Sequence, residues 1–225
     1  MFDAIAFRYD FVNRVLSLRR DVVWRKAMVA ALPRGQGLHA LDLATGTGDV
    51  LLALQQAGSP VAHVVGADVS GTMLRYGQQK IEQAGHAASS ALVQTDAAAL
   101  CFSDNTFDVV TVAFGVRNFS ELEAGLREMR RVLRADGCAI ILEFSLPVNP
   151  LFRTAYLLYF RHVLPRIAGL LSRQPAAYHY LNRSVEAFPY GEAFCTMLHD
   201  AGYVKIKARP LTFGITTLYI GYKST

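Results

Sequence analysis

Apolar and polar residues recur with two different periods along this chain, and segments of the two kinds alternate. Short apolar runs typical of buried strands lie near 38–44, 61–67, 91–95, 107–114 and 137–145. Segments in which apolar residues recur with helical spacing lie between them, mainly near 48–57, 70–84 and 121–134. Strands that alternate with amphipathic helices predict an α/β fold, with a mostly parallel sheet covered by helices on both faces.

Both ends of the chain depart from this alternation. Residues 2–32 show helical spacing in two pieces, and helical spacing also dominates 151–200. Two short strands are predicted near 203–209 and 214–223, with Arg209-Pro210 as the turn signal between them. The sequence therefore predicts seven strands, of which the last two form an antiparallel pair after a helical segment.

The composition indicates a globular chain with a basic surface. Hydrophobic residues make up 52% of the 225 residues, charged residues make up 18%, and the net charge is +5. A chain of this length is expected to form one domain with a sizeable core. The positive charge suits nucleic acid or an anionic membrane as a partner. Because the arginines are scattered, we predict no contact with nucleic acid.

Targeting and metal signals are absent from the sequence. The start, Met1-Phe2-Asp3, lacks the basic residues and the apolar run of a signal peptide. The apolar segment 154–171 is interrupted by charged residues and is not expected to span a membrane. The cysteines Cys101, Cys138 and Cys195 show no metal-ligand spacing. These features predict a cytoplasmic protein that holds no metal.

A glycine-rich turn follows the first predicted strand in the segment 41–49, which reads Leu-Asp-Leu-Ala-Thr-Gly-Thr-Gly-Asp. Gly46 and Gly48 allow positive φ and a close approach of the backbone to a ligand. Leu51 replaces the third glycine of a dinucleotide-binding turn, and Asp49 places a carboxylate where a pyrophosphate would lie. That charge suits the ammonium group of S-adenosylmethionine (SAM), which carries no phosphate.

Acidic residues at the ends of the next two predicted strands fit the rest of this ligand. Asp68 suits the ribose hydroxyls, and Asp96 suits the adenine amino group, because a carboxylate oxygen accepts hydrogen bonds. Strand ends in an open α/β sheet line one crevice, so we expect these residues to converge with 113–118. The alternatives are a tight turn without a ligand, dipole stabilisation of a helix start by Asp49, and N-caps at Asp68 and Asp96.

The fourth predicted strand runs into a turn that reads Ala-Phe-Gly-Val-Arg-Asn-Phe over 113–119. Enzymes that methylate exocyclic amines often carry an Asp/Asn-Pro-Pro-Tyr turn at this place, and this chain has no such proline pair. Phe114, Arg117 and Asn118 instead offer a ring, a cation and an amide. These groups suit a planar acceptor whose oxygen substituents gain negative charge. Alternatively, Arg117 pairs with Glu121 or caps a helix.

Several segments match the signatures of one family. The two main signatures lie at 9–17, followed by Trp24, and at 131–137, ending at 143–145. Further matches lie at 41–49, 67–68, 104–108, 114–118, 156–165, 178–181, 188–189, 201–202 and 221–223. The chain therefore resembles the demethylmenaquinone / 2-methoxy-6-polyprenyl-1,4-benzoquinol methyltransferase family of quinone biosynthesis. The resemblance covers nearly the whole sequence.

The resemblance implies the fold and the division of the chain. It implies the seven-stranded, mostly parallel Rossmann-like sheet of a class I SAM methyltransferase, in a single domain over 1–225. N-terminal helices over 1–32 would act as a lid. The helical insertion between strands 5 and 6, about 146–190, would shape the acceptor pocket, by analogy with other enzymes of this fold.

The resemblance also implies SAM as the cofactor. The family's contacts fall on Thr47, Asp68, Asp96 and Ala97, next to the glycines of the turn. A further contact, usually a serine, falls on Ala113, where only the backbone can substitute. Other departures from the family pattern are Asp21 in place of a histidine, Arg134-Ala135-Asp136 in place of Lys-Pro-Gly, and Tyr219-Ile220 in place of His-Arg.

The implied reaction is methyl transfer from SAM to a ring carbon of a reduced prenylated quinone precursor, for which we favour demethylmenaquinol. The alternatives are 2-methoxy-6-polyprenyl-1,4-benzoquinol, both quinols, or a non-prenylated phenol-like acceptor. A hypothesis of another class is an inactive SAM-binding protein that serves as an assembly partner.

Four residues are candidates for catalysis. We expect Arg117 and Asn118 to bind the developing oxyanion of the acceptor, Tyr9 to close the pocket, and His162 to act as the base. Tyr9 could instead only dock the first helix, and His162 could be a core histidine. Glu143, at the end of the fifth predicted strand, faces either the crevice or a helix end.

A further surface is predicted on the segment 151–171. Its apolar stripe consists of Leu157, Phe160, Leu164, Ala168 and Leu171, and its flanking cations are Arg153, Arg161 and Arg166. The stripe either packs in the core or contacts anionic lipid and admits a prenyl tail. The second alternative predicts peripheral, salt-sensitive association with the inner face of the membrane. A homodimer is the other candidate assembly.

Overall fold

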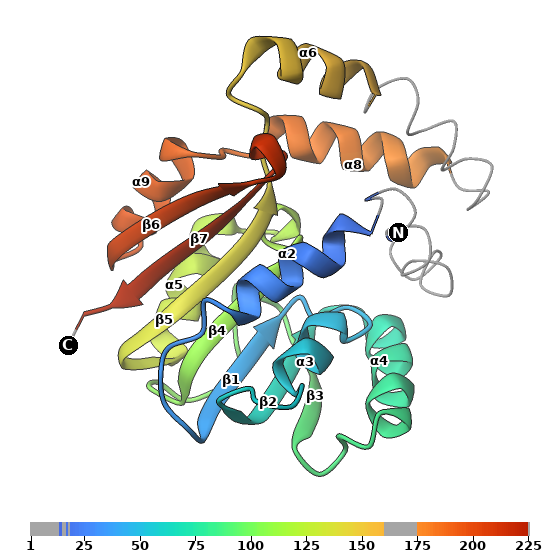
Figure 1. Ribbon diagram of the computed structural model, residues 1–225. Helices are drawn as coiled ribbons and strands as arrows, with labels where there is room; N and C mark the ends of the chain where they lie inside the picture. Colours follow the sequence, from blue (N-terminus) through green and yellow to red (C-terminus); the bar gives the residue numbers. More distant parts are fainter. Residues whose placement is uncertain (1–13, 15–16, 18, 160–174, 225) are drawn as a thin grey trace.

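The computed structural model describes Arg14, Ser17 and residues 19–159 and 175–224, without the side chains of 175–179 and 181 (Figure 1). The predicted catalytic residues Tyr9 and His162 lie outside the described residues. The same holds for the part of the predicted apolar stripe that begins at Phe160.

Seven strands form one sheet, as the sequence predicts. In chain order they are β1 (Leu38–Leu43), β2 (Val61–Asp68), β3 (Ser90–Gln94), β4 (Phe107–Ala113), β5 (Leu133–Phe144), β6 (Tyr203–Leu211) and β7 (Thr216–Lys223). Their order across the sheet is β3-β2-β1-β4-β5-β7-β6. β7 runs antiparallel to β5 and to β6, and the other pairings are parallel. The predicted mostly parallel sheet with a terminal antiparallel pair is therefore confirmed.

Helices cover both faces of this sheet (Figure 1). The α-helices of the described residues are α2 (Arg20–Val29), α3 (Asp49–Leu54), α4 (Gly71–Gln83), α5 (Leu122–Val132), α6 (Pro150–Leu158), α8 (Pro175–Ala187) and α9 (Glu192–Asp200). Buried residues of α2, α3 and α4 belong to one apolar cluster, and those of α5 and α9 belong to a second. The central strands lie between the two clusters, which explains their almost continuous apolar sequences.

The last turn differs from the prediction. The turn expected at Arg209-Pro210 is wrong, because Pro210 lies within β6 and is paired with Thr217. The chain reverses instead at the 3-10 turn η4 (Thr212–Gly214). β6 is one of the two edge strands of the sheet, and an edge strand tolerates a residue without an N–H where that position faces outward.

The carboxyl ends of the parallel strands bring the predicted site residues to one edge of the sheet. β1 leads into the glycine-rich turn 44–48, which ends where α3 begins. β4 leads into the 3-10 turn η2 (Val116–Asn118). Figure 1 shows α6 and α8, the described helices of the insertion, beyond the end of β5. Ligand sites of open α/β sheets lie at this edge.

Candidate active site

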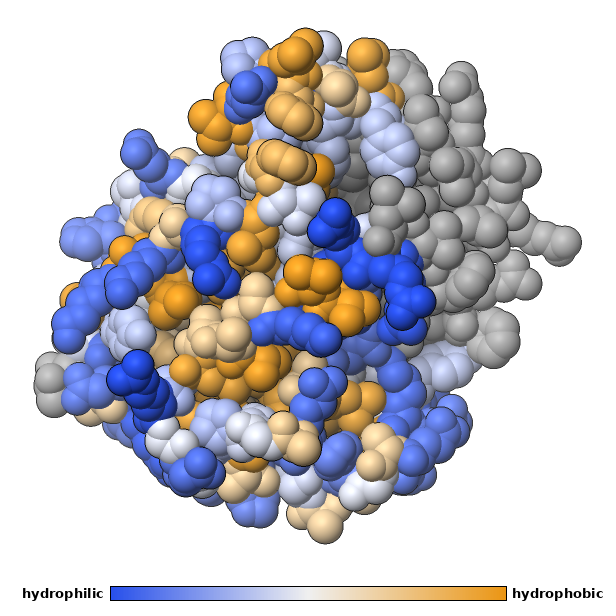
Figure 2. Space-filling model, in the orientation of Figure 1, coloured by the Kyte–Doolittle hydropathy of each residue, from blue (hydrophilic) through white to orange (hydrophobic). Residues whose placement is uncertain are grey.

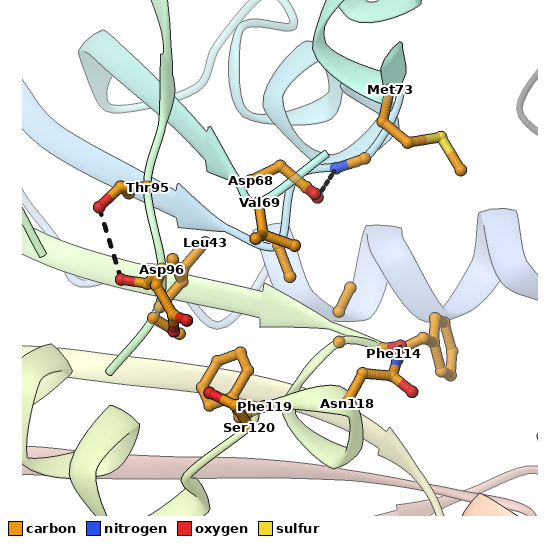
Figure 3. A pocket seen from close by; sticks show the side chains of 15 residues that line it. Leu43, Asp68, Val69, Met73, Thr95, Asp96, Phe114, Asn118, Phe119 and Ser120 are labelled. Atoms are coloured by element: carbon orange, nitrogen blue, oxygen red, sulfur yellow. Dashed lines mark hydrogen bonds between the residues drawn. The ribbon is translucent and has the colours of Figure 1, made fainter. Parts of the chain in front are cut away.

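A cavity of about 200 Å³ lies at the carboxyl ends of the parallel strands (Figure 3). Its lining comprises Leu43, Ala44, Gly46, Asp68, Val69, Met73, Thr95, Asp96, Ala97, Ala113, Phe114, Gly115, Asn118, Phe119 and Ser120. The lining contains the predicted residues Gly46, Asp68, Asp96, Ala97, Ala113 and Asn118. The structure thus brings five of the predicted cofactor residues and part of the predicted acceptor turn to one cavity, whereas Thr47, Gly48 and Asp49 are not part of its lining.

The glycine-rich turn is open on the side of the cavity and packed on the side of α4. Gly46 and Gly48 have φ of 57° and 81°, values that glycine adopts readily. A Cβ at Gly46 would meet no atom within 4 Å, so a ligand has room against the backbone there. A Cβ at Gly48 would lie 3.7 Å from the Cα of Gly77 in α4. This open space over a bare backbone fits a SAM molecule.

Asp68 holds the turn from the end of β2. Its Oδ2 accepts a hydrogen bond of 2.8 Å from the N–H of Gly46, and its Oδ1 accepts one of 2.9 Å from the N–H of Ser70. Figure 3 shows the Asp68 carboxylate turned toward the backbone of the turn, at the wall of the cavity. Each carboxylate oxygen can accept a second hydrogen bond, so Asp68 can also bind ribose hydroxyls.

Asp42 is a buried acidic residue to which the sequence analysis assigns no role. It lies on β1, and its two oxygens accept hydrogen bonds from the hydroxyls of Thr45, at 2.6 Å, and Thr111, at 2.8 Å. Burial raises the pKa of Asp42 to about 7, although the two threonine hydrogen bonds oppose that shift. Its sequence signal is an acidic residue between Leu41 and Leu43 in a mostly apolar strand.

This raised pKa predicts a pH-dependent stability. The folded state keeps the Asp42 proton up to about pH 7, whereas the unfolded chain loses it near pH 3.8. The folded state therefore binds more protons in this window, and stability falls as the pH rises through it. Between pH 5 and pH 8 the loss should be about 3 kcal/mol. Urea denaturation should show that Asp42→Asn removes this part of the dependence, and parallel pH profiles for the two proteins would contradict the assignment.

Asp49 does not line the cavity, and cations surround it. Its carboxylate forms ion pairs with Lys80 of α4, with Arg25 of α2 at 3.3 Å, and with Arg14 at 3.9 Å. Burial alone would raise the pKa of Asp49, but these cations hold it below its usual range. Arg25 also pairs with Asp21 at 2.8 Å, and Lys80 also donates to Thr47 at 3.2 Å. An ammonium group of a ligand would therefore compete with Arg25 and Lys80 for the Asp49 carboxylate. These ion pairs already link α2 and α4 to the turn.

Arg117 is paired with Glu143, an arrangement that differs from both sequence alternatives for Arg117. Its Nη1 donates to Glu143 Oε1 at 2.7 Å and to the carbonyl of Phe114 at 2.6 Å. The side chains of Arg117 and Glu143 are 6% and 0% exposed, and the guanidinium lies over the ring of Phe144 at 5.3 Å. Its Nε is buried without a hydrogen-bond partner among the described residues. Arg117 therefore holds the turn after β4, and one of its donors has no partner within the described part of the chain.

Asn118 connects this turn to the helical insertion. Its Oδ1 accepts a hydrogen bond of 3.1 Å from the hydroxyl of Tyr180 in α8. Asn118 also lines the cavity. The hydrogen bond therefore joins α8 to a residue of the predicted acceptor site. In the sequence, Tyr180 lies in a segment that matches the family, and nothing near it indicates a role. The spacing of 62 residues between the two explains why no local pattern could pair them.

An aromatic cluster forms the wall behind the predicted acceptor turn. Phe114 lines the cavity, and its ring centroid lies 4.5 Å from that of Phe144 and 5.7 Å from that of Trp24. Trp24 is a buried residue of α2. Large rings of this kind suit a flat aromatic acceptor, and they join the N-terminal helix to the cavity wall.

Asp96 and Ala113 have the positions that the sequence analysis predicts, at the ends of strands. Asp96 is exposed after β3, and its Oδ1 accepts a hydrogen bond of 2.9 Å from the N–H of Ala98. Ala113 ends β4 and has no side-chain hydrogen-bonding group. Both line the cavity, and their binding of SAM stays a prediction.

Sequence comparisons give this chain similar relatives over nearly its full length. The model of the family described as the ubiE/COQ5 methyltransferase family matches residues 1–223. A ubiquinone/menaquinone biosynthesis C-methyltransferase UbiE from Geotalea uraniireducens is 44% identical over 223 residues, which cover 99% of this chain and 94% of the relative. A demethylmenaquinone methyltransferase from Thermus thermophilus is 43% identical, with 98% of this chain and 99% of the relative covered.

A comparison with solved structures supports the fold. A SAM-dependent methyltransferase from Thermotoga maritima, described as a possible histamine N-methyltransferase, aligns with a TM-score of 0.70. The alignment covers 99% of this chain and 98% of that one, at 14% sequence identity. At this identity the likeness concerns the fold alone, and it confirms the predicted class I methyltransferase architecture.

Proposed function

The chain belongs to the ubiE/COQ5 methyltransferase family, and on this premise we propose that it methylates a ring carbon of demethylmenaquinol, a reduced prenylated quinone. The family and the fold make it a SAM-dependent C-methyltransferase. The observation that carries the proposal is one cavity lined by Asp68, on the cofactor side, and by Phe114 and Asn118, on the acceptor side. A methyl group and a ring carbon can meet only in such a shared space.

The cofactor side consists of the turn after β1 and the strand ends beside it. SAM, when bound, supplies an electrophilic methyl group. We assign its binding to Gly46, Thr47 and Gly48 in the turn, and to the strand-end residues Asp68, Asp96, Ala97 and Ala113. Asp49 acts indirectly in this proposal, because its ion pairs with Lys80 and Arg25 hold the turn against α4 and α2.

The acceptor side binds the quinol oxygens. A ring carbon becomes a strong nucleophile when a neighbouring hydroxyl ionises, so donors near that oxygen favour the reaction. Asn118 lines the cavity and offers an amide, and Arg117 offers a buried Nε that has no other partner among the described residues. Leaving a buried donor unpaired costs about 1–3 kcal/mol, which a substrate oxygen would offset. Tyr9 as pocket-closing residue and His162 as base stay predictions.

We assign the whole of 1–225 to one domain. The ion pair between Arg25 and Asp49 supports a lid role for residues 1–32, because it ties α2 to the start of α3. The hydrogen bond between Tyr180 and Asn118 supports an acceptor-side role for the insertion 146–190. The two segments would then enclose the cavity from different sides.

A second candidate acceptor is 2-methoxy-6-polyprenyl-1,4-benzoquinol. The observation that favours it is the name of the Geotalea uraniireducens relative, which includes ubiquinone as well as menaquinone biosynthesis. Both quinols offer a hydroxyl next to an unsubstituted ring carbon. One site that contacts only ring and hydroxyl would accept both.

Methyl transfer from labelled SAM to the two reduced quinones, measured side by side, tests this function. We expect label in menaquinol when demethylmenaquinol is supplied, and none when the quinone is supplied oxidised, because the oxidised ring is not nucleophilic. Label in the benzoquinol product as well would establish the dual activity. If SAM binds but neither quinol is labelled, the proposed acceptor class is wrong.

The lipid character of the acceptor suggests where the enzyme works. Among the described residues no helix has both the length and the apolar character needed to cross a bilayer. A prenylated quinol is nevertheless held in the membrane, so we propose peripheral contact with the inner face of the membrane. A homodimer is the alternative use of an exposed apolar surface, and the experiment below separates the two.

A further inference from the structure

We propose that one face of the molecule, formed by the turn η4, the start of α6 and the end of β6, docks on an anionic lipid bilayer. The inference rests on the proposed function, because a membrane-held acceptor gives the enzyme a reason to dock. It goes further in naming the surface. This surface differs from the stripe expected on 151–171, most of which lies outside the described residues.

The centre of this face is a group of exposed apolar side chains from two segments distant in sequence. We call it the apolar tip, and it consists of Val148, Leu151, Phe152 and Phe213, which are 88%, 80%, 50% and 74% exposed. The rings of Phe152 and Phe213 are stacked, with centroids 5.0 Å apart and planes at 9°. Figure 2 shows hydrophobic side chains gathered over this end of the molecule. Exposed apolar side chains that gather in one place are typical of an interaction surface.

Side chains of α2 and of the segment after β5 anchor the turn that carries Phe213 by hydrogen bonds. Phe213 has φ 58° and ψ 20°, a left-handed conformation that residues other than glycine rarely adopt. Trp24 Nε1 donates to the hydroxyl of Thr212 at 2.8 Å, and the hydroxyl of Ser145 donates to the carbonyl of Gly214 at 2.7 Å. An exposed aromatic ring in a strained and anchored turn points to a function for the ring.

Basic residues lie on β6, the strand that leads into the turn of the apolar tip. Lys207 and Arg209 are exposed and lie two residues apart. In the pairing of β6 with β7 they lie opposite Ile220 and Leu218. Alternate residues of a strand point to the same side, so both cations share the α2 side of the sheet. Neither has an ion-pair partner in the part of the chain that the structure describes. Unpaired cations beside exposed aromatic rings suit anionic lipid headgroups.

The proposed surface lies close to the acceptor wall of the cavity. Thr212, next to Phe213 in sequence, is hydrogen-bonded to Trp24. Trp24 packs against Phe114, which lines the cavity. A chain of side-chain contacts therefore connects the docking face to the acceptor site.

Charge argues for lipid over a second copy of the chain. A two-fold dimer places the same patch of each subunit against the other. Docking of two apolar tips in this way would bring the Lys207 and Arg209 side chains of both copies near one another. Like charges repel at such an interface, whereas an anionic bilayer attracts them.

Vesicle binding tests the surface directly. We expect the full chain to sediment with vesicles that contain about one third phosphatidylglycerol, and to bind pure phosphatidylcholine much more weakly. Phe152→Ser with Phe213→Ser should lower the partition coefficient by about 10-fold or more on both. Lys207→Glu with Arg209→Glu should abolish the preference for the anionic lipid. The control Arg127→Glu reverses one charge at an exposed position of α5, where the double variant reverses two, and it should leave binding within about 2-fold.

The outcomes separate docking from the proposed reaction. With a short-chain, water-soluble quinol the tip variants should turn over like the wild type, and only turnover of vesicle-held quinol should fall. Vesicle binding that is absent in the wild type at low salt, or unchanged in the tip variants, overturns the proposal. A dimer by light scattering that the tip variants abolish, without vesicle binding, assigns the surface to a second copy. Docking without methyl transfer to any quinol contradicts the proposed function alone.

Discussion

Replacement of Asp68 by Ala is expected to weaken SAM binding by about 100-fold or more. The Asp68 carboxylate lines the cavity and, in the proposed complex, accepts charge-assisted hydrogen bonds from the ribose. Each such bond contributes about 1.5–3 kcal/mol. The same substitution also removes the acceptor of the Gly46 N–H, which lies 2.8 Å from Oδ2, so the glycine-rich turn loses one of its anchors. The lost ribose contacts and the loosened turn should both weaken the binding of SAM.

Isothermal titration of SAM, with urea denaturation of the same proteins, measures this effect. Asp108→Ala is the matched control, because Asp108 also accepts a backbone N–H, from His39 at 2.8 Å, but at the opposite edge of the sheet. We expect Asp108→Ala to lower the stability modestly and to leave the SAM affinity unchanged. A natively stable Asp68→Ala protein whose SAM affinity lies within about 3-fold of the wild type would exclude Asp68 from the cofactor site.

Replacement of Arg117 by Ala is expected to damage both stability and turnover. Glu143 is fully buried, and without its cation the carboxylate would be an uncompensated buried charge. Loss of one partner of such a pair destabilises a protein by about 3–5 kcal/mol. If Arg117 also binds the acceptor oxygen, turnover should fall by about 100-fold or more. The SAM affinity of the protein that stays folded should change little, because Arg117 is not part of the lining of the cavity.

A paired substitution separates the two roles of Arg117. Arg117→Met with Glu143→Gln removes both charges, fills the space of the guanidinium stem, and keeps an acceptor for the Phe144 N–H, now 2.8 Å from Glu143 Oε1. We expect this protein to regain most of the lost stability, because removal of both charges of a buried pair is often close to neutral. Its turnover should stay low. Recovery of turnover together with stability would show that Arg117 is structural only.

The sheet and the cofactor turn were open to sequence analysis because their signals are local. Apolar runs and helical spacing repeat within a few residues. They therefore predict the order of strands and helices along the chain, and the antiparallel pair of strands at its end. The glycines at 46 and 48 and the acidic strand end at Asp68 belong to such local patterns. The cavity brings Gly46 and Asp68 together as expected.

Residue partners far apart in sequence escaped the analysis. The local sequence offers Glu121, four residues away, as an ion-pair partner for Arg117, but Arg117 pairs with Glu143 across the ends of β4 and β5. Asp49 has Arg25 and Lys80 as partners, which α2 and α4 bring to it, and its contact with a ligand stays a prediction. In both cases a buried or half-buried charge takes the partner that the packing of elements supplies, which local spacing does not contain.

The sequence by itself determined the family, the class of cofactor and the edge of the sheet where chemistry is expected. The tertiary structure alone decided which charges neutralise one another and which apolar side chains stay exposed. Pro210 in an edge strand and Phe213 in an anchored turn show why. Burial of a side chain depends on the elements that pack around it, and those contacts form only when segments distant in sequence meet in the fold.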